Sequence, residues 1–288
     1  MYIDELKKIK AKRVFVQYPE GLKTKIKEID DELKKNGFET VLCCEPTFGA
    51  CDVRDFEAKR LGCDAILHVA HTDFGVKSDL PVIYWDYFLD ADPIPLIEKE
   101  FEKIEKYTTI GLFTSLQYIP LMNKVKEYLE NRGKKAVVAK SQKYEGQVLG
   151  CRMDAALKLD AECLLFIGTG KFHPLGVALA TDKPVFSLDL EKQQIIDFKE
   201  EKMKYLKKKA WHQEKVKEAN TVAIAVSWKQ GQNRIDEAFK IKKDLESQGK
   251  NVYILAFDVI SKEKIIGMKF DVIINMACPR MDDEDLLA

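Results

Sequence analysis

The chain has 288 residues and a mass of 33.0 kDa, more than a single hydrophobic core usually holds, which favours two or three domains. Lys+Arg and Asp+Glu both number 47, so the formal net charge is zero and gives no support to a nucleic-acid or membrane-surface protein. The first residues, MYIDELKKIKAKRVFV, lack the uninterrupted apolar stretch of a signal peptide, and no apolar run is long enough to cross a bilayer. We therefore expect a cytoplasmic protein without direct contact to membrane or nucleic acid.

The predicted elements come in three similar segments. Residues 1–92 show apolar, β-rich runs at 13–16, 39–43 and 64–67, with a helix through Leu33 between the first two. Residues 93–198 repeat this order, with strands predicted at 110–113, 135–139 and 162–165. Residues 199–288 do so again, at 222–226, 251–255 and 271–274, after a lysine-rich stretch at 199–209 that predicts an exposed linking helix. In each segment an acidic residue opens the third strand.

Alternating strands and helices with nearly continuous apolar strands are typical of parallel sheets covered by helices. We therefore expect an α/β protein of three similar small domains, 1–92, 93–198 and 199–288. We also expect the domains to be arranged around a pseudo-threefold axis with a central cluster site. Ligands of such sheets bind beyond the carboxyl ends of the strands, and this edge is where chemistry is expected.

The seven cysteines include no CxxC pair and follow no secretion signal, which favours thiols or metal ligands over disulfides. Cys51, Cys151 and Cys278 each follow a predicted strand at a corresponding edge of one segment, among loop residues. Each domain would then deliver one thiolate to a shared metal cluster, and three protein ligands leave a coordination position open for a substrate. The other four lie in or beside strands and are expected in the core: Cys43, Cys44, Cys63 and Cys163.

Six motifs carry a resemblance to a known family. In order they are QYPEGL (17–22), EPTFGACDV (45–53), GQVLGC (146–151), FHPLG (172–176), KQGQ (229–232) and ACPR (277–280). They resemble the diphthamide-biosynthesis family, specifically its archaeal single-subunit 2-(3-amino-3-carboxypropyl)histidine synthases, and span nearly the whole chain.

The resemblance implies a transferase, a noncanonical radical enzyme that uses S-adenosylmethionine. Cys51, Cys151 and Cys278 would hold a [4Fe-4S] cluster with one open iron, as soft thiolate ligands suit. Reductive cleavage between the sulfur and the γ-carbon would transfer the 3-amino-3-carboxypropyl group to imidazole C2 of a histidine in translation elongation factor 2, the first step of diphthamide formation. Elongation factor 2, an electron donor and a second copy of the chain, as a homodimer, are the implied partners.

Other residues are candidates for binding the cosubstrate S-adenosylmethionine. A glycine-rich turn after a third strand, with a nearby histidine, is expected to accommodate the adenosine: Gly168, Thr169, Gly170 and His173. Polar loop residues of the third segment are expected to hold its carboxylate or ribose: Gln230, Gly231, Arg234 and Arg280. No catalytic residue is predicted beyond the cluster ligands.

Three alternatives remain open at this point. The first is a quinolinate-synthase-like dehydratase, which also has three related domains and a cluster with an open iron. The second is a noncatalytic subunit with a mainly structural role. The third is a zinc hydrolase, in which the thiolates would bind zinc. The order of the motifs favours the diphthamide enzyme. Since family members usually continue further after the last cysteine, we expect the third segment to be shortened at its C-terminal end.

Overall fold

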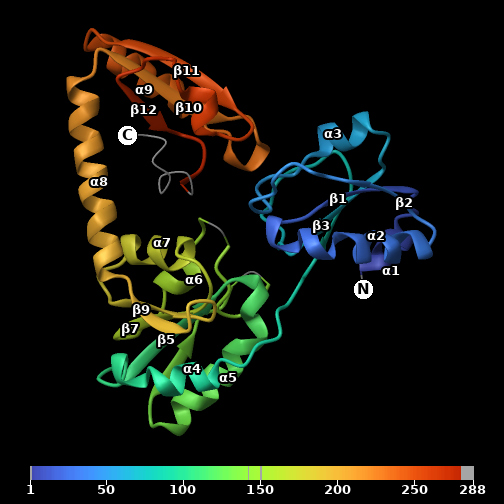
Figure 1. Ribbon diagram of the computed structural model, residues 1–288, viewed down its shortest axis with the longest axis vertical. Helices are drawn as coiled ribbons and strands as arrows, with labels where there is room; N and C mark the ends of the chain where they lie inside the picture. The colour runs from blue at the N-terminus through green and yellow to red at the C-terminus, as the bar shows by residue number, and fades with distance from the viewer. Residues whose placement is uncertain (1, 142, 150, 280–288) are drawn as a thin grey trace. The chain divides into compact units, whose positions relative to one another are not determined.

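The computed structural model describes residues 2–141, 143–149 and 151–279 (Figure 1). These residues form three β-sheets in two compact units. Unit 1 comprises residues 1–50, 55–74 and 78–203 and carries two of the sheets. Unit 2 comprises residues 51–54, 75–77 and 204–288 and carries the third. The short segment Cys51–Arg54 therefore belongs to unit 2, although its neighbours in the chain belong to unit 1.

The first sheet of unit 1 is parallel, with strand order β2-β1-β3-β4. Its strands are β1 (Arg13–Gln17), β2 (Glu39–Leu42), β3 (Ala65–Val69) and β4 (Val82–Trp85), and its helices are α1 (Tyr2–Lys8), η1 (Glu20–Lys25), α2 (Ile26–Lys35) and α3 (Asp55–Arg60). Val14 and Val16 point to one face of β1 because strand side chains alternate, and there they share a core with Ile29 and Leu33, one turn apart on α2.

The second sheet of unit 1 has the order β6-β5-β7-β8-β9. Its strands are β5 (Thr109–Thr114), β6 (Lys135–Val138), β7 (Cys163–Gly168), β8 (Val185–Asp189) and β9 (Gln194–Asp197). Its helices are α4 (Ile94–Lys99), η2 (Phe101–Lys103), η3 (Leu116–Tyr118), α5 (Ile119–Asn131), α6 (Asp154–Leu157) and α7 (Phe172–Ala180). All pairs are parallel except β8 with β9, where Asp189 Oδ1 accepts hydrogen bonds from the backbone N–H groups of Glu191 and Lys192 and so closes a hairpin turn.

Unit 2 contains a parallel sheet of order β11-β10-β12. Its elements are β10 (Thr221–Ser227), η4 (Gln230–Gln232), α9 (Ile235–Ser247), β11 (Asn251–Phe257), α10 (Lys262–Ile265) and β12 (Val272–Asn275). The two faces of β10 differ in size: Val222 and Ile224 pack with Leu245 of α9, whereas Ala223 and Ala225 face a separate cluster. Burying each Val or Ile side chain contributes about 1.5–3 kcal/mol, so the α9 face supplies most of the stabilisation of this strand.

One carboxylate in each sheet joins the starts of two strands. The acid that precedes the third strand of each segment accepts hydrogen bonds from backbone N–H groups at the start of the first strand. The pairs are Asp64 with Lys12 N at 2.9 Å, Glu162 with Thr108 N at 2.6 Å and Asp271 with Thr221 N at 2.7 Å. The acidic position that recurs in the sequence is therefore a repeated structural device that satisfies donors at the amino ends of the strands.

The fold class expected from the sequence is confirmed: the protein is α/β, with parallel sheets flanked by helices. All nine predicted strands are present, and each sheet lies within one of the ranges 1–92, 93–198 and 199–288. Strands β4, β8 and β9 are additional to the predicted set, and β9 is antiparallel to its neighbour β8.

Helix α8 (Lys199–Glu218) is the lysine-rich helix that the sequence predicts, and none of its residues is buried. It joins the two units in the chain, since unit 1 ends at Met203 and unit 2 resumes at Lys204. Among the described residues, no helix combines the length and apolar character needed to traverse a bilayer.

Candidate metal centre and its surroundings

Cys51 is held in unit 2 by the loop that follows β10. The backbone N–H of Gly231 donates to the carbonyl oxygen of Cys51 at 2.9 Å, and Gln232 Nε2 donates to Cys51 Sγ at 3.3 Å. A β-carbon on Gly231 would lie 2.6 Å from both Cα and the carbonyl oxygen of Cys51, closer than real contacts allow. Glycine is therefore required here for the two backbones to approach, and its N–H fixes the carbonyl of Cys51.

Four charged side chains, two of them in the segment Cys51–Arg54 and two outside it, form a network of ion pairs. Lys229 Nζ lies 2.6 Å from Asp52 Oδ2, and Arg54 Nη2 donates to Asp258 at 2.9 and 3.1 Å. The two pairs are connected, because Arg54 Nε lies 3.6 Å from Asp52 Oδ1 and Lys229 Nζ lies 3.8 Å from Asp258 Oδ1. Burial raises the pKa of Asp52, and the ammonium of Lys229 opposes that rise. The network fixes the segment next to Cys51 at the carboxyl ends of β10 and β11.

Cys278 also belongs to unit 2 and lies three residues after the last residue of β12 (Asn275). Asn275 Nδ2 donates to the carbonyl oxygen of Cys278 at 2.8 Å, while Asn275 Oδ1 accepts from Ala277 N at 3.0 Å. One asparagine thereby closes the turn at both ends. The thiol side chain is half-buried, as is that of Cys51, and both lie in loops rather than in the apolar core.

Cys151 belongs to unit 1 and is exposed. It lies in a tight turn, in which Arg152 N donates to the carbonyl oxygen of Leu149 at 2.7 Å and Leu149 N donates to that of Arg152 at 3.1 Å. Its loop follows β6 and passes the carboxyl end of β5, where Val148 N donates to the carbonyl oxygen of Thr114 at 2.8 Å. Like Cys51 and Cys278, Cys151 thus lies beyond the carboxyl end of a parallel strand.

All seven cysteines lie within the described residues and all are thiols. Cys43, Cys63 and Cys163 are buried, which confirms the expectation of core packing for these three; burial raises the pKa of the Cys163 thiol to about 12. The same expectation is wrong for Cys44, which is exposed. β2 is an edge strand and ends at Leu42, so the chain has left the sheet before it reaches this residue.

The glycine-rich turn proposed to pack adenosine lies at the end of β7 in unit 1. Gly168 has φ +151°, and a β-carbon there would lie 2.9 Å from Tyr118 Cδ2. Thr169 Oγ1 lies 2.9 Å from the hydroxyl of Tyr118, and Gly170 has φ +76° with open space around its Cα. His173 stacks on Phe166 with ring centroids 5.8 Å apart. The four predicted residues therefore lie together around one turn.

The predicted contacts of the third segment are less uniform. Gln230 and Gly231 both belong to η4, next to Cys51. The guanidinium of Arg234 forms an exposed ion pair with Glu237 on the first turn of α9, which gives it a structural partner. Arg280 lies outside the described residues.

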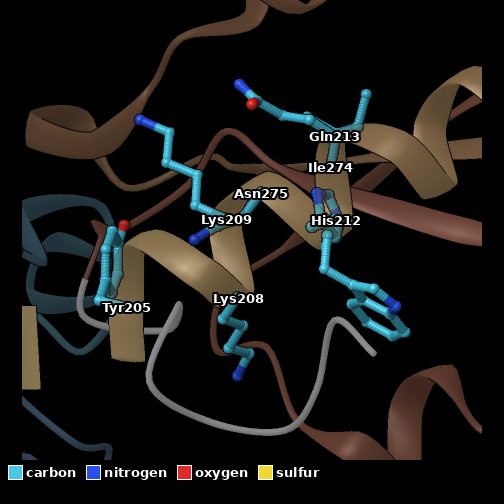
Figure 2. A pocket seen from close by; sticks show the side chains of 8 residues that line it. Tyr205, Lys208, Lys209, His212, Gln213, Ile274 and Asn275 are labelled. Atoms are coloured by element: carbon cyan, nitrogen blue, oxygen red, sulfur yellow. The ribbon is translucent and has the colours of Figure 1, made fainter. Parts of the chain in front are cut away.

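A pocket of about 230 Å³ lies between α8 and the carboxyl end of β12 in unit 2 (Figure 2). Its lining residues are Tyr205, Lys208, Lys209, Trp211, His212, Gln213, Ile274 and Asn275. His212 Nε2 lies 2.9 Å from the carbonyl oxygen of Ile273, which anchors the helix to the strand. Because Asn275 also bonds the carbonyl of Cys278, the pocket shares one wall with the turn that carries this cysteine.

Sequence reasoning missed the buried charges and the donor to sulfur. Asp52 stands directly after Cys51 within EPTFGACDV, and Lys229 and Gln232 belong to KQGQ, so their place in the motifs was the available signal. In unit 1, Gln147 of GQVLGC was also missed: its Nε2 donates to Thr72 Oγ1 at 2.8 Å, and its buried Oε1 has no hydrogen-bond partner within the described part of the chain.

The three thiols suit an iron–sulfur cluster by their chemistry. Each lies in a loop, none forms a disulfide, and soft thiolates are the usual ligands of such clusters. Among the residues that the structure describes, no three His, Cys, Asp or Glu side chains form a group that could hold a metal ion. A site at Cys51, Cys151 and Cys278 is therefore a proposal and not an observed arrangement.

Comparison with known proteins gives consistent matches. The family model for diphthamide synthesis proteins matches residues 18–286. A 2-(3-amino-3-carboxypropyl)histidine synthase of Pyrococcus horikoshii is 33% identical over 98% of this chain and 83% of its own length, and that of Methanocaldococcus jannaschii is 29% identical over 99% and 82%. The crystal structure of Dph2 from Pyrococcus horikoshii with a 4Fe-4S cluster is similar with a TM-score of 0.88, over 97% of this chain and 83% of that one.

Proposed function

Because the chain belongs to the diphthamide synthesis family, we propose that it transfers the 3-amino-3-carboxypropyl group of S-adenosylmethionine to imidazole C2 of a histidine in translation elongation factor 2. The observation that carries this proposal is the match of nearly the whole chain to a relative that was crystallised with a 4Fe-4S cluster. The reaction is the first step of diphthamide formation and takes place in the cytoplasm, and the working form is a homodimer served by an electron donor.

We assign the cluster ligands to Cys51, Cys151 and Cys278. A bound [4Fe-4S] cluster would supply the electron that breaks the bond between the sulfur and the γ-carbon of S-adenosylmethionine, so that methylthioadenosine leaves. The γ-carbon would then bond to imidazole C2, the C2 hydrogen would leave as a proton, and one electron would return to the oxidised cluster. The transfer consumes no net electron.

The role of the chain's own residues is to bind and orient. The sulfonium of S-adenosylmethionine has three carbon–sulfur bonds, and the choice of one depends on how the molecule is held. Gly168, Thr169, Gly170 and His173 are proposed to pack the adenosine; Gln230, Gly231, Arg234 and Arg280 are proposed to bind its carboxylate or ribose.

The buried carbonyl oxygen of Gln147 fits a bound polar ligand. It is an acceptor without a donor within the described part of the chain, and a buried acceptor of this kind costs about 1–3 kcal/mol until it is paired. Its place in the loop that leads to Cys151 makes the ammonium group of the cosubstrate a suitable donor. A hydrogen bond from this ammonium group to Gln147 Oε1 would then offset the free-energy cost of the unpaired acceptor.

The test is anaerobic reconstitution of the chain with iron and sulfide, reduction with dithionite, and addition of S-adenosylmethionine and elongation factor 2. We expect methylthioadenosine and a modified histidine, which mass spectrometry detects. 5′-Deoxyadenosine as the product would indicate a conventional radical enzyme, and an intact cosubstrate would favour a dehydratase or a noncatalytic subunit. Cys51→Ala, Cys151→Ala and Cys278→Ala should each abolish the reaction, whereas Cys44→Ala, which removes an exposed thiol, serves as the matched control.

A further inference from the structure

The Cys51 sulfur already has a hydrogen-bond donor in the protein. Gln232 Nε2 lies 3.3 Å from Cys51 Sγ, a normal separation for an N–H group that donates to sulfur. Gln232 lies at the end of η4, and its side chain reaches the sulfur from the loop that follows β10. The donor is an uncharged carboxamide, so it can bind a thiolate without introducing a full positive charge beside it.

Both ends of this contact are fixed by other bonds. On the donor side, Gln232 N donates to the carbonyl oxygen of Lys229 at 2.9 Å. On the sulfur side, the carbonyl of Cys51 is bonded to Gly231, and the next residue, Asp52, is paired with the ammonium of Lys229 at 2.6 Å. The same short loop therefore holds the backbone of Cys51, the side chain of its neighbour and the sulfur itself.

On the premise of the proposed function, we propose that Gln232 is a positioning residue whose N–H group binds the Cys51 thiolate in the loaded protein and makes the bound cluster easier to reduce. Reduction adds one negative charge, which spreads over the cluster and its thiolates. A hydrogen bond to a ligand sulfur stabilises the more negative state more than the less negative one, and so raises the reduction potential.

The experiment compares Gln232→Met with the wild-type chain after anaerobic reconstitution. Methionine keeps the length and most of the volume of glutamine but has no N–H donor. The matched control is Gln248→Met, the same change at an exposed position after α9 in the same unit. Iron content is measured first, and the midpoint potential is then obtained by redox titration followed by electron paramagnetic resonance.

We expect Gln232→Met to bind as much iron as the wild type and to show a more negative midpoint potential, with Gln248→Met unchanged. At a fixed solution potential the fraction of reduced cluster in Gln232→Met should fall, and a stronger reductant should restore it. Equal potentials in Gln232→Met and wild type at equal iron content would overturn the proposal.

A second measurement needs no folded variant. Wild-type protein made with glutamine labelled with ¹⁵N at the side-chain amide should show a ¹⁵N hyperfine coupling in the pulsed resonance spectrum of the reduced cluster. Absence of that coupling would overturn the proposal even if the variant failed to take up iron. Failure of the proposed function looks different, because then the wild type would bind no cluster or would leave S-adenosylmethionine intact.

Discussion

Replacing Lys229 by Met tests how strongly the buried charges fix the Cys51 segment. The change removes the ammonium 2.6 Å from Asp52 and leaves a carboxylate whose side chain is only 2% exposed. Breaking a buried ion pair by removing one partner costs about 3–5 kcal/mol, because the remaining charge has lost its compensation. Arg54 still lies 3.6 Å from Asp52, but its guanidinium is already committed to Asp258, so we expect a loss of about 3 kcal/mol.

The assay is urea unfolding followed by fluorescence, with Trp85 and Trp211 replaced by Phe in every variant, so that Trp228 next to the mutated residue reports on unit 2. The matched control is Lys217→Met, which removes the same group from an exposed pair with Glu214 on α8. Exposed helical pairs contribute about 0.2–0.5 kcal/mol, so the control should differ little from the parent.

The double variant Lys229→Met/Asp52→Leu tests the stated cause. If the cost arises from an unpaired buried charge, removing that charge as well should recover much of the lost stability. A double variant that is less stable than Lys229→Met would refute the reasoning. A loss for Lys229→Met as small as that for Lys217→Met would refute it too.

Three further predictions concern Gly231, the buried and exposed thiols, and Asp271. Gly231→Ala forces a methyl group to within 2.6 Å of the Cys51 backbone, so we expect it to destabilise unit 2 by about 1–3 kcal/mol and to lower the iron content after reconstitution. Iodoacetamide near pH 8, with peptide mass spectrometry, should label Cys44 quickly and spare Cys163 in the folded chain without cluster, because burial raises the pKa of the latter to about 12. Hydrogen bonds from the start of β10 lower the pKa of Asp271, so its carboxylate should stabilise the fold at pH values above the ordinary carboxyl pKa. This stabilisation should be lost as the pH falls through the lowered pKa. Unfolding measurements on Asp271→Asn should no longer show this pH dependence.

For each of these predictions, one measured result would contradict the physical reason given. Gly21→Ala is the control for the glycine variant, because a β-carbon there meets no atom within 4 Å, and equal stability of the two variants would contradict the steric argument. Labelling of Cys163 at the rate of Cys44 would contradict its burial. A constant stability difference between wild type and Asp271→Asn from about pH 6 to 3 would show that the carboxylate form is not preferentially bound in the fold.

The sequence predicted the central strands because they are buried on both faces and carry uninterrupted apolar residues, as Val222–Val226 of β10 do. The repeat itself then located their counterparts. Comparing the three segments did not locate β4 and β8. Each is the fourth parallel strand of its sheet, and the described part of the third segment has no strand that corresponds to them. The edge strand β9 (Gln194–Asp197) was missed because it has only four residues and two of them are polar.

The sequence singles out Cys51, Cys151 and Cys278 by their loop neighbours, and the structure places all three in loops. The side chains that contact them could not be predicted. With 47 basic and 47 acidic residues, charge alone allows many partners for Lys229, and only the fold brings it to Asp52. The donor Gln232 was likewise hidden, because a glutamine in a polar loop has no pattern that distinguishes a contact to sulfur from a solvated side chain. Long-range pairings of this kind depend on the tertiary structure and not on local periodicity.

The membership of Cys51–Arg54 in unit 2 has a consequence for how the protein is made. These residues leave the ribosome early, whereas Lys229, Gly231 and Asp258, which hold them, are synthesised near the end. The early segment can be bound only after these later residues have been synthesised, so the backbone of Cys51 reaches its final position only after translation has passed Gly231. Expressing the C-terminal residues alone would also leave Lys229 with a cavity in place of its aspartate, which makes the unit unsuitable for study as an isolated fragment.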